Sequence, residues 1–281
     1  MDFIKKFENK VKTTIKEHNL LTKKDKILVA CSGGKDSTTI LYLLNKLGYH
    51  VEGLIIDLLI GSWSKENLKN VEKFCKKNKI KLHTINIREE FGYSICYIRS
   101  GIQSKVKLNN CTICGVIKRY LLNKKSRELK ATKLVTGHNL DDEAENLLMN
   151  QFKGNPKLSI NLGPTTGTLK DKRFVKRTKP LYFCTNKEVK QYSKLKNFPV
   201  LYKPCPCAVG VFRKEMKDIL IELEKHNPNI KLNLVNNFLT LLPSLKEKYK
   251  DKTKLRYCDN CQEPSRNKIC KACSLIRILA V

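Results

Sequence analysis

Short apolar-rich segments alternate with amphipathic segments through the first half of the chain. The short segments have the length of strands, and the amphipathic ones repeat their apolar residues at helical spacing. The expected strands are 27–31, 51–57, 81–87 and 133–137. The expected helices are 1–20, 36–47, 64–78, 112–130 and 141–152. This β-α order predicts an α/β fold, a doubly wound parallel sheet with helices on both faces.

The second half has a weaker pattern. Loops and short strands are expected over 154–180, and helices over 186–196, 211–225 and 231–249. The chain ends in a compact cysteine module. We therefore expect four parts, an N-terminal helix, a catalytic domain, a helical extension and a cysteine module, at 1–25, 26–205, 206–250 and 251–281.

The charge is strongly positive. There are 56 Lys and Arg against 26 Asp and Glu, a net charge of +30, which attracts polyanions. A basic run at 169–179 includes Phe174; such a run is usually a solvated face, but here it favours contacts with a nucleic-acid backbone. The candidate contacts are Lys170, Lys172, Arg173, Lys176, Arg177 and Lys179.

No segment approaches the roughly 20 apolar residues of a membrane span, and the first residues lack a signal-peptide core. We expect a cytoplasmic protein with no membrane partner. Its twelve cysteines should then not form disulfides. The isolated ones are expected to be small buried hydrophobic residues: Cys31, Cys75, Cys96 and Cys184.

The segment Ser32–Ser37, Ser-Gly-Gly-Lys-Asp-Ser, lies between the first expected strand and its helix. Two glycines permit a sharp turn, and the free amides of a helix N-terminus bind phosphate. The segment is not a Walker A loop. It resembles the PP-loop of ATP pyrophosphatases. We expect an ATP site here and at neighbouring strand ends, made of Ala30, Ser32, Gly33, Gly34, Lys35, Asp36, Ser37, Asp57, Gly137 and His138.

Eight cysteines form four close pairs. The last two pairs, Cys258/Cys261 and Cys270/Cys273, are two CxxC motifs eight residues apart, a pattern typical of structural zinc. The other pairs are distant in sequence and can meet only in space. From their spacing alone, an iron–sulfur cluster, a second zinc ion and a redox-active pair that carries persulfide all remain open. These pairs are Cys111/Cys114 and Cys205/Cys207.

Four features in order resemble the ATP-dependent tRNA 2-thiolation (thiouridine synthetase) family of PP-loop ATP pyrophosphatases. They are the loop, the segments Cys111–Arg119 and Gly137–Ala144, and the C-terminal cysteines. The resemblance implies a PP-loop domain, ATP with Mg²⁺, a [4Fe-4S] cluster, tRNA as partner, a sulfur donor and a homodimer. By position it implies cluster ligands at Cys111, Cys114 and Cys205, and catalytic roles for Lys118 and Asp142.

Three details depart from that pattern or leave a choice. The N-terminal cysteine pairs common in thiouridine synthetases have no counterpart, since no cysteine precedes Cys31. Cys207 is an extra thiol that competes with Cys205 for the third ligand position. Asp141 is also a catalytic candidate, although one of Asp141 and Asp142 can serve only at the helix start.

The expected function is a tRNA uridine 2-sulfurtransferase. ATP would adenylate the C2 oxygen of a uridine, and sulfur would replace it. Another PP-loop adenylating enzyme, of the amidotransferase or lysidine synthetase type, would leave the internal cysteines unused. A non-catalytic RNA-binding zinc protein would leave the intact loop unexplained.

Overall fold

The protein has an α/β fold around a six-stranded sheet with the order β3-β2-β1-β4-β6-β5. The computed structural model describes residues 2–166, 171, 173–208, 212–249 and 255–280. Five strands are parallel, and β5 pairs antiparallel with β6 at the edge. The strands are β1 (Ile27–Cys31), β2 (Val51–Asp57), β3 (Leu82–Asn86), β4 (Lys133–Val135), β5 (Thr165–Thr166) and β6 (Lys176–Thr178). The predicted fold class is confirmed.

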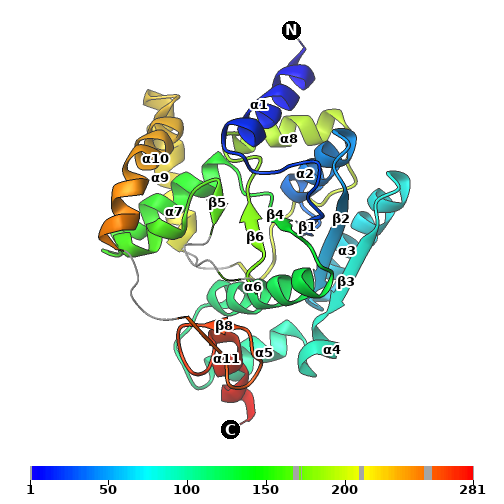
Figure 1. Ribbon diagram of the computed structural model, residues 1–281, viewed down its shortest axis with the longest axis vertical. Coiled ribbons are helices and arrows are strands. Elements are labelled where there is room, and N and C mark those ends of the chain that lie inside the picture. Colours follow the sequence, from blue (N-terminus) through cyan, green and yellow to red (C-terminus); the bar gives the residue numbers. More distant parts are fainter. Residues whose placement is uncertain (1, 167–170, 172, 209–211, 250–254, 281) are drawn as a thin grey trace.

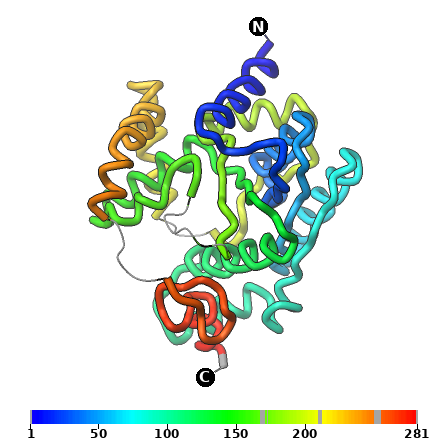
Figure 2. The backbone as a smooth tube through the Cα atoms, in the orientation of Figure 1, coloured from blue at the N-terminus to red at the C-terminus, as the bar shows by residue number. Residues whose placement is uncertain are grey.

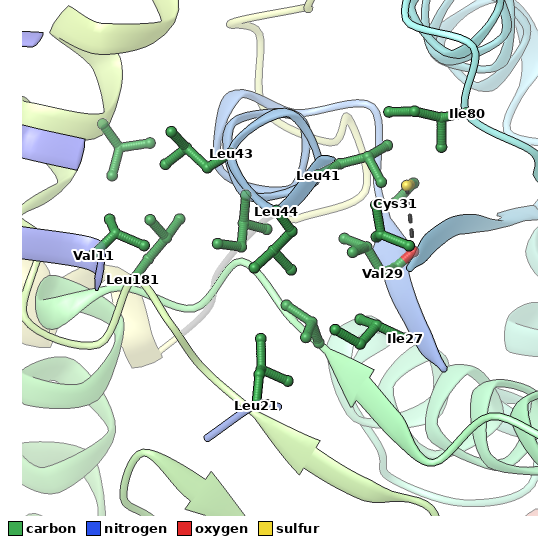
Figure 3. Packing of buried hydrophobic residues seen from close by; sticks show 14 of the residues in the cluster. Val11, Leu21, Ile27, Val29, Cys31, Leu41, Leu43, Leu44, Ile80 and Leu181 are labelled. Atoms are coloured by element: carbon green, nitrogen blue, oxygen red, sulfur yellow. Dashed lines mark hydrogen bonds between the residues drawn. The ribbon is translucent and has the colours of Figure 1, made fainter. Parts of the chain in front are cut away.

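Helices cover both faces of the sheet (Figure 1). On one face lie α1 (Phe3–Glu17), α2 (Lys35–Lys46), α3 (Gly61–Lys77) and α8 (Asn186–Leu195). On the other lie α5 (Ile95–Gln103) and α6 (Asn110–Glu128). The strands alternate accordingly: Ile27 and Val29 pack into the first core, shown in Figure 3, while Leu28 packs into the second. Residues of the central strand β1 are therefore buried on both faces, as expected for a parallel sheet.

Two helices between β3 and α6 were not predicted. They are α4 (Ile87–Phe91) and α5. Ser94 caps α5 by accepting a hydrogen bond from the Tyr97 amide at 3.3 Å. Ile95, Ile98 and Ile102 are buried at helical spacing. A serine N-cap followed by this periodicity is a readable helix signal.

A third apolar cluster lies beside the sheet. It joins α7 (Leu140–Phe152), the 3₁₀ turn Pro156–Asn161, and the two helices α9 (Phe212–His226) and α10 (Ile230–Lys248). Figure 2 shows α7, α9 and α10 grouped together at one side of the molecule. The division of the chain at residues 25, 205 and 250 stays a prediction.

The C-terminal module packs on α5 and α6. It comprises the hairpin β7 (Arg256–Tyr257) and β8 (Pro264–Ser265), followed by α11 (Lys271–Ala280), a helix the sequence pattern did not predict. A Cβ on Gly101 would lie 2.6 Å from Leu279, so α5 and α11 meet closely at that glycine. In the described residues no helix is long and apolar enough to cross a membrane.

Strand order reverses between β1 and β4. The chain moves outward from β1 through β2 to β3, then returns to the other side of β1 with β4. Ligands of open parallel sheets bind at such a reversal, outside the carboxyl ends of the strands. The PP-loop and Gly137 follow these two strands, so the fold brings them together at one edge of the sheet.

Candidate nucleotide and cysteine sites

The loop at 32–37 turns directly from β1 into α2. Gly33 has φ of +77°, and a Cβ there would come within 2.3 Å of the Asn67 side chain. Glycine is therefore required both for conformation and for space. The Ser37 hydroxyl donates to the Gly34 carbonyl at 3.2 Å. No side chain caps α2 at Gly34, so the first amides of the helix are available to an anion.

The end of β4 closes on this loop. A Cβ on Gly137 would lie 2.7 Å from the Ser37 amide nitrogen. The next residue, His138, has an exposed ring whose Nδ1 is 2.9 Å from the Thr136 hydroxyl. Although part of the residue is exposed, protein packed around the imidazole disfavours its charged form and lowers the pKa of His138, and the carboxylate of Asp142 opposes this only in part. A neutral imidazole beside the phosphate loop can hydrogen-bond without adding charge.

Two acidic side chains converge behind the loop. Asp36 pairs with the Lys35 ammonium at 2.7 Å and accepts from the Asn139 side-chain amide at 3.0 Å. Asn139 caps α7, and Asp142 completes the capping box by accepting from the Asn139 amide at 3.0 Å. Burial raises the pKa of Asp36; Lys35 lowers it, and Asp142 raises it further. Two neighbouring carboxylates of this kind suit a divalent cation.

The two aspartates at the start of α7 differ in their partners. Asp141 pairs with Lys231 at 2.8 Å and accepts from the Asn186 amide at 2.7 Å, which joins α7 to α10 and α8. Asp142 pairs with Arg213 at 2.6 Å, and its charge also acts on Asp36. Asp142 is therefore the better placed of the two for chemistry at the loop, whereas Asp141 is engaged in joining three helices; the catalytic role of each stays a prediction.

Ala30 and Asp57 lie at the same edge of the sheet. Ala30 is the penultimate residue of β1, and Asp57 is the last of β2. The Asp57 carboxylate accepts from the Leu59 amide at 3.0 Å. Both are half-buried, and their part in an ATP site stays a prediction.

The internal cysteine pairs meet in space. Asn109 caps α6, which places Cys111 in its first turn, exposed, and Cys114 one turn later, buried. The side-chain amide of Asn110 donates to the Cys207 carbonyl at 3.2 Å, so the second pair lies against the start of α6. Because α6 leads back to the amino end of β4, its own start lies toward the carboxyl edge of the sheet.

The charge of Lys118 acts on one thiol of each pair. Burial raises the pKa of both Cys114 and Cys205. The positive charge of Lys118 lowers the pKa of each thiol and so opposes this effect in part. Cys205 packs against the apolar cluster that contains Cys114. Soft thiolates of this kind select iron–sulfur clusters or zinc, and the assignment of Cys111, Cys114 and Cys205 as cluster ligands stays a prediction.

Another cation was missed by the sequence reasoning. Arg99, on α5, lies with its guanidinium 3.1 Å from the sulfurs of Cys96 and Cys207. The prediction that Cys96 is a buried hydrophobic residue is wrong, because its side chain is exposed and contacts this arginine. The expected burial is confirmed for Cys31, Cys75 and Cys184. None of the twelve cysteines is in a disulfide.

The C-terminal cysteines form a compact four-sulfur group. Ligand atoms of Cys258, Cys261, Cys270 and Cys273 lie within 4.8 Å of one another. Backbone N–H groups, led by that of Cys270 at 3.2 Å, lower the pKa of Cys258 to about 6 against the effect of burial. Tetrahedral zinc at about 2.3 Å from each sulfur requires sulfurs close together, and this group meets that requirement.

The basic run has a mixed outcome. Lys170 and Lys172 lie outside the described residues. Lys179 is buried and pairs with buried Glu143 at 2.7 Å, so it is not accessible to a nucleic acid and its prediction as a contact is corrected. Arg173 lies over the Tyr257 ring at 3.8 Å and supports the cysteine module.

The accessible members of the run line a cavity of about 1330 Å³ between α6, β6 and the cysteine module. Lys176 and Arg177 belong to it, together with Arg119 from α6, which the sequence reasoning did not select. Within the part of the chain that the structure describes, neither Arg119 nor Arg177 has a hydrogen-bond or carboxylate partner. Burial and the charge of Arg119 lower the pKa of Arg177. Two unpaired guanidinium groups in one cavity are suited to bind phosphate.

The chain matches the PP-loop domain family over residues 4–201. It is 38% identical to the tRNA-5-methyluridine(54) 2-sulfurtransferase of Pyrococcus horikoshii, over 95% of this chain and 83% of that protein. It belongs to the PP-loop tRNA 2-thiolation family. Cytoplasmic tRNA 2-thiolation protein 1 of Caenorhabditis elegans is 32% identical over 98% of this chain and 73% of that one.

A solved structure of the family is also similar. The U34-tRNA thiolase NcsA from Methanococcus maripaludis, solved with its [4Fe-4S] cluster, superposes with a TM-score of 0.83 at 30% identity. The match covers 99% of this chain and 89% of NcsA. The membership drawn from four sequence motifs is confirmed, and it is an enzyme family.

Residues whose contacts are distant in sequence were not predicted from the sequence. Arg213 lies in a predicted helix but has no local feature that links it to Asp142, 71 positions earlier. Asn139 had a readable signal, since an asparagine before a helix with an acidic residue three positions later indicates a capping box. No local signal marks Arg99 or Arg119 as a binding residue.

Proposed function

We propose that this protein is a tRNA uridine 2-sulfurtransferase that uses ATP and a [4Fe-4S] cluster. One observation carries the proposal: a PP-loop and a separate cysteine centre lie at the carboxyl side of one parallel sheet. A PP-loop alone supports adenylation of many substrates. The cysteines add the capacity to deliver sulfur.

In the first half of the reaction, the C2 oxygen of uridine would attack the α-phosphate of ATP and release pyrophosphate. The amides at the start of α2, with Lys35 and Ser37, would neutralise phosphate charge as it shifts. Asp36 would bind Mg²⁺ with Asp142 nearby, which would relieve the repulsion between the two carboxylates.

In the second half, sulfur would attack C2 and AMP would leave with the original oxygen. A cluster held by three cysteines has one iron without a protein ligand, which can bind sulfide. Lys118 would stabilise negative charge near the reacting carbon or donate a proton to the departing group. Cys111, Cys114 and Cys205 would hold the cluster, and Zn²⁺ would occupy the C-terminal cysteines.

The tRNA would lie across the cavity that contains Arg119, Lys176 and Arg177. We further propose a cytoplasmic homodimer that receives sulfur from free sulfide or a sulfur-carrier protein. Relatives are named for two different tRNA positions, 54 and 34.

The test is anaerobic reconstitution of the purified protein with iron and sulfide, followed by incubation with tRNA, ATP and sulfide. Mass spectrometry of the digested nucleosides should reveal 2-thiolated uridine, and AMP and pyrophosphate should form in equal amounts. Thiolated product without ATP, or AMP formation without tRNA dependence, would contradict the proposal.

A further inference from the structure

Arg99 is a buried cation surrounded by sulfur. Only 6% of the residue is exposed. Its Nη2 atom lies 3.1 Å from both the Cys96 and the Cys207 sulfurs, and Nη1 lies 3.9 Å from the Cys114 sulfur. Its Nε has no hydrogen-bond partner in the part of the chain that the structure describes.

This arrangement is costly unless the sulfurs carry negative charge. A guanidinium removed from water needs an anion or several good acceptors, and a neutral thiol is a weak acceptor. Within the described residues, no carboxylate pairs with Arg99. Thiolates and the sulfurs of a metal cluster are anionic, and hydrogen bonds to them are strong. Of the three sulfurs, only that of Cys114 belongs to the ligands proposed above, so a bound cluster would place its negative charge beside Arg99 through Cys114.

Arg99 also separates the two competing thiols. The Cys207 sulfur is held by the guanidinium, whereas none of the described contacts of Arg99 involves the Cys205 sulfur. The side-chain amide of Asn110 also donates to the Cys207 carbonyl. The Cys207 sulfur is thereby occupied by its hydrogen bond from Arg99. The Cys205 sulfur is left available to bind a metal.

We propose that Arg99 is a positioning residue of the cysteine centre: it is the fixed countercharge of the bound cluster, and it holds Cys207 so that Cys205 is the third ligand. This inference rests on the proposed function, because it assumes that a cluster binds here. Hydrogen bonds and positive charge near cluster sulfurs favour the reduced, more negative state.

The experiment measures the reduction of the reconstituted cluster by redox titration, with no turnover assay. Arg99→Gln removes the charge, Arg99→Lys keeps it, and Arg88→Gln removes an exposed arginine from the neighbouring helix α4 as a matched control. At the wild-type midpoint potential, Arg99→Gln should lower the ratio of reduced to oxidised cluster by about tenfold, the value of one charge-assisted hydrogen bond. Arg99→Lys should change it less, and Arg88→Gln should leave it unchanged.

A second measurement covers the ligand choice. Cys205→Ser should bind little iron, and adding Arg99→Gln to it should restore part of the iron because Cys207 is released. Zinc content and thermal unfolding serve as checks of folding.

Three results would overturn the proposal: an unchanged midpoint in Arg99→Gln, loss of iron from both Arg99 variants with the fold intact, or no recovery of iron in the double variant. Failure of the proposed function looks different. In that case the wild-type protein itself would bind no cluster after reconstitution.

Discussion

Gly137 lies against the start of α2 so closely that a Cβ on it would stand 2.7 Å from the amide nitrogen of Ser37. This contact joins the two strand ends that flank the reversal of strand order. Backbone cannot yield as a flexible side chain can, so the loop depends on this glycine for its position.

Gly137→Ala should therefore displace the PP-loop and weaken ATP binding by tenfold or more, with a lower melting temperature as well. Gly115→Ala is the matched control, because its Cβ would meet only the flexible end of Arg119 at 3.1 Å. Calorimetric titration with ATP checks the prediction. Equal ATP affinity in both variants would show that the crevice between β1 and β4 is not the nucleotide site.

Lys35→Ala and Ser37→Ala should each lower the thiolation rate by roughly 100-fold at saturating ATP, because each removes a donor to phosphate charge that shifts during adenylation. Unfolding free energies should change much less. Lys24→Ala, an exposed lysine outside the loop, should keep the parent rate. Parent-like rates in both loop variants would mean that the loop does not bind the reacting nucleotide.

Affinity for tRNA should fall steeply with salt, by about 10³-fold or more between roughly 50 and 200 mM if six or more phosphates are bound. Changing Arg119, Lys176 and Arg177 together to Gln should reduce the slope of log affinity against log salt by about 0.7–0.9 for each phosphate that is no longer neutralised. The control removes equal charge from α8, at exposed Lys187, Lys190 and Lys194.

Filter binding or fluorescence anisotropy at several salt concentrations measures both slopes. A slope that changes equally in the two triple variants would show that the cavity contributes only general charge. That result would not contradict the proposed thiolation activity.

Cys205→Ser should lose the visible absorption of the cluster and the thiolation activity, whereas Cys207→Ser should retain most of both. The reason is that a true ligand binds iron directly, while the Cys207 sulfur is held by Arg99 at 3.1 Å. Iron and zinc analysis of anaerobically purified variants checks this, with zinc expected to remain in each. The reverse pattern of iron loss would show that Cys207 is the ligand.

Zinc should hold the C-terminal module together, so Cys258→Ser should lose zinc and expose the module to rapid hydrogen exchange. Backbone N–H groups hold the pKa of the Cys258 thiol below its usual range even without metal, which favours the thiolate that zinc requires. Acidification should release zinc, since protons compete for the thiolates, and release should need a pH below about 6 because the bound metal itself favours the ionised form. Zinc release measured with a chromogenic chelator checks both points. Full zinc retention in Cys258→Ser would exclude the four-cysteine site.

Local sequence determined most of the framework of this protein. The strands at 27–31 and 51–57, the helix after the PP-loop and the C-terminal CxxC pairs are each encoded within a few residues, because periodicity, glycine turns and ligand spacing act over short distances. The helices α4 and α11 were missed since apolar runs in short or metal-bound segments are ambiguous.

Only the tertiary structure decided which distant residues meet. Lys179 reads as part of a basic surface, yet packing buries it against Glu143. Cys205 and Cys207 lie more than ninety positions from Cys111, and the order of the parallel strands brings them together. Arg99 acquires its sulfur partners only there, because a side chain's charge environment comes from neighbours in space that no local pattern encodes.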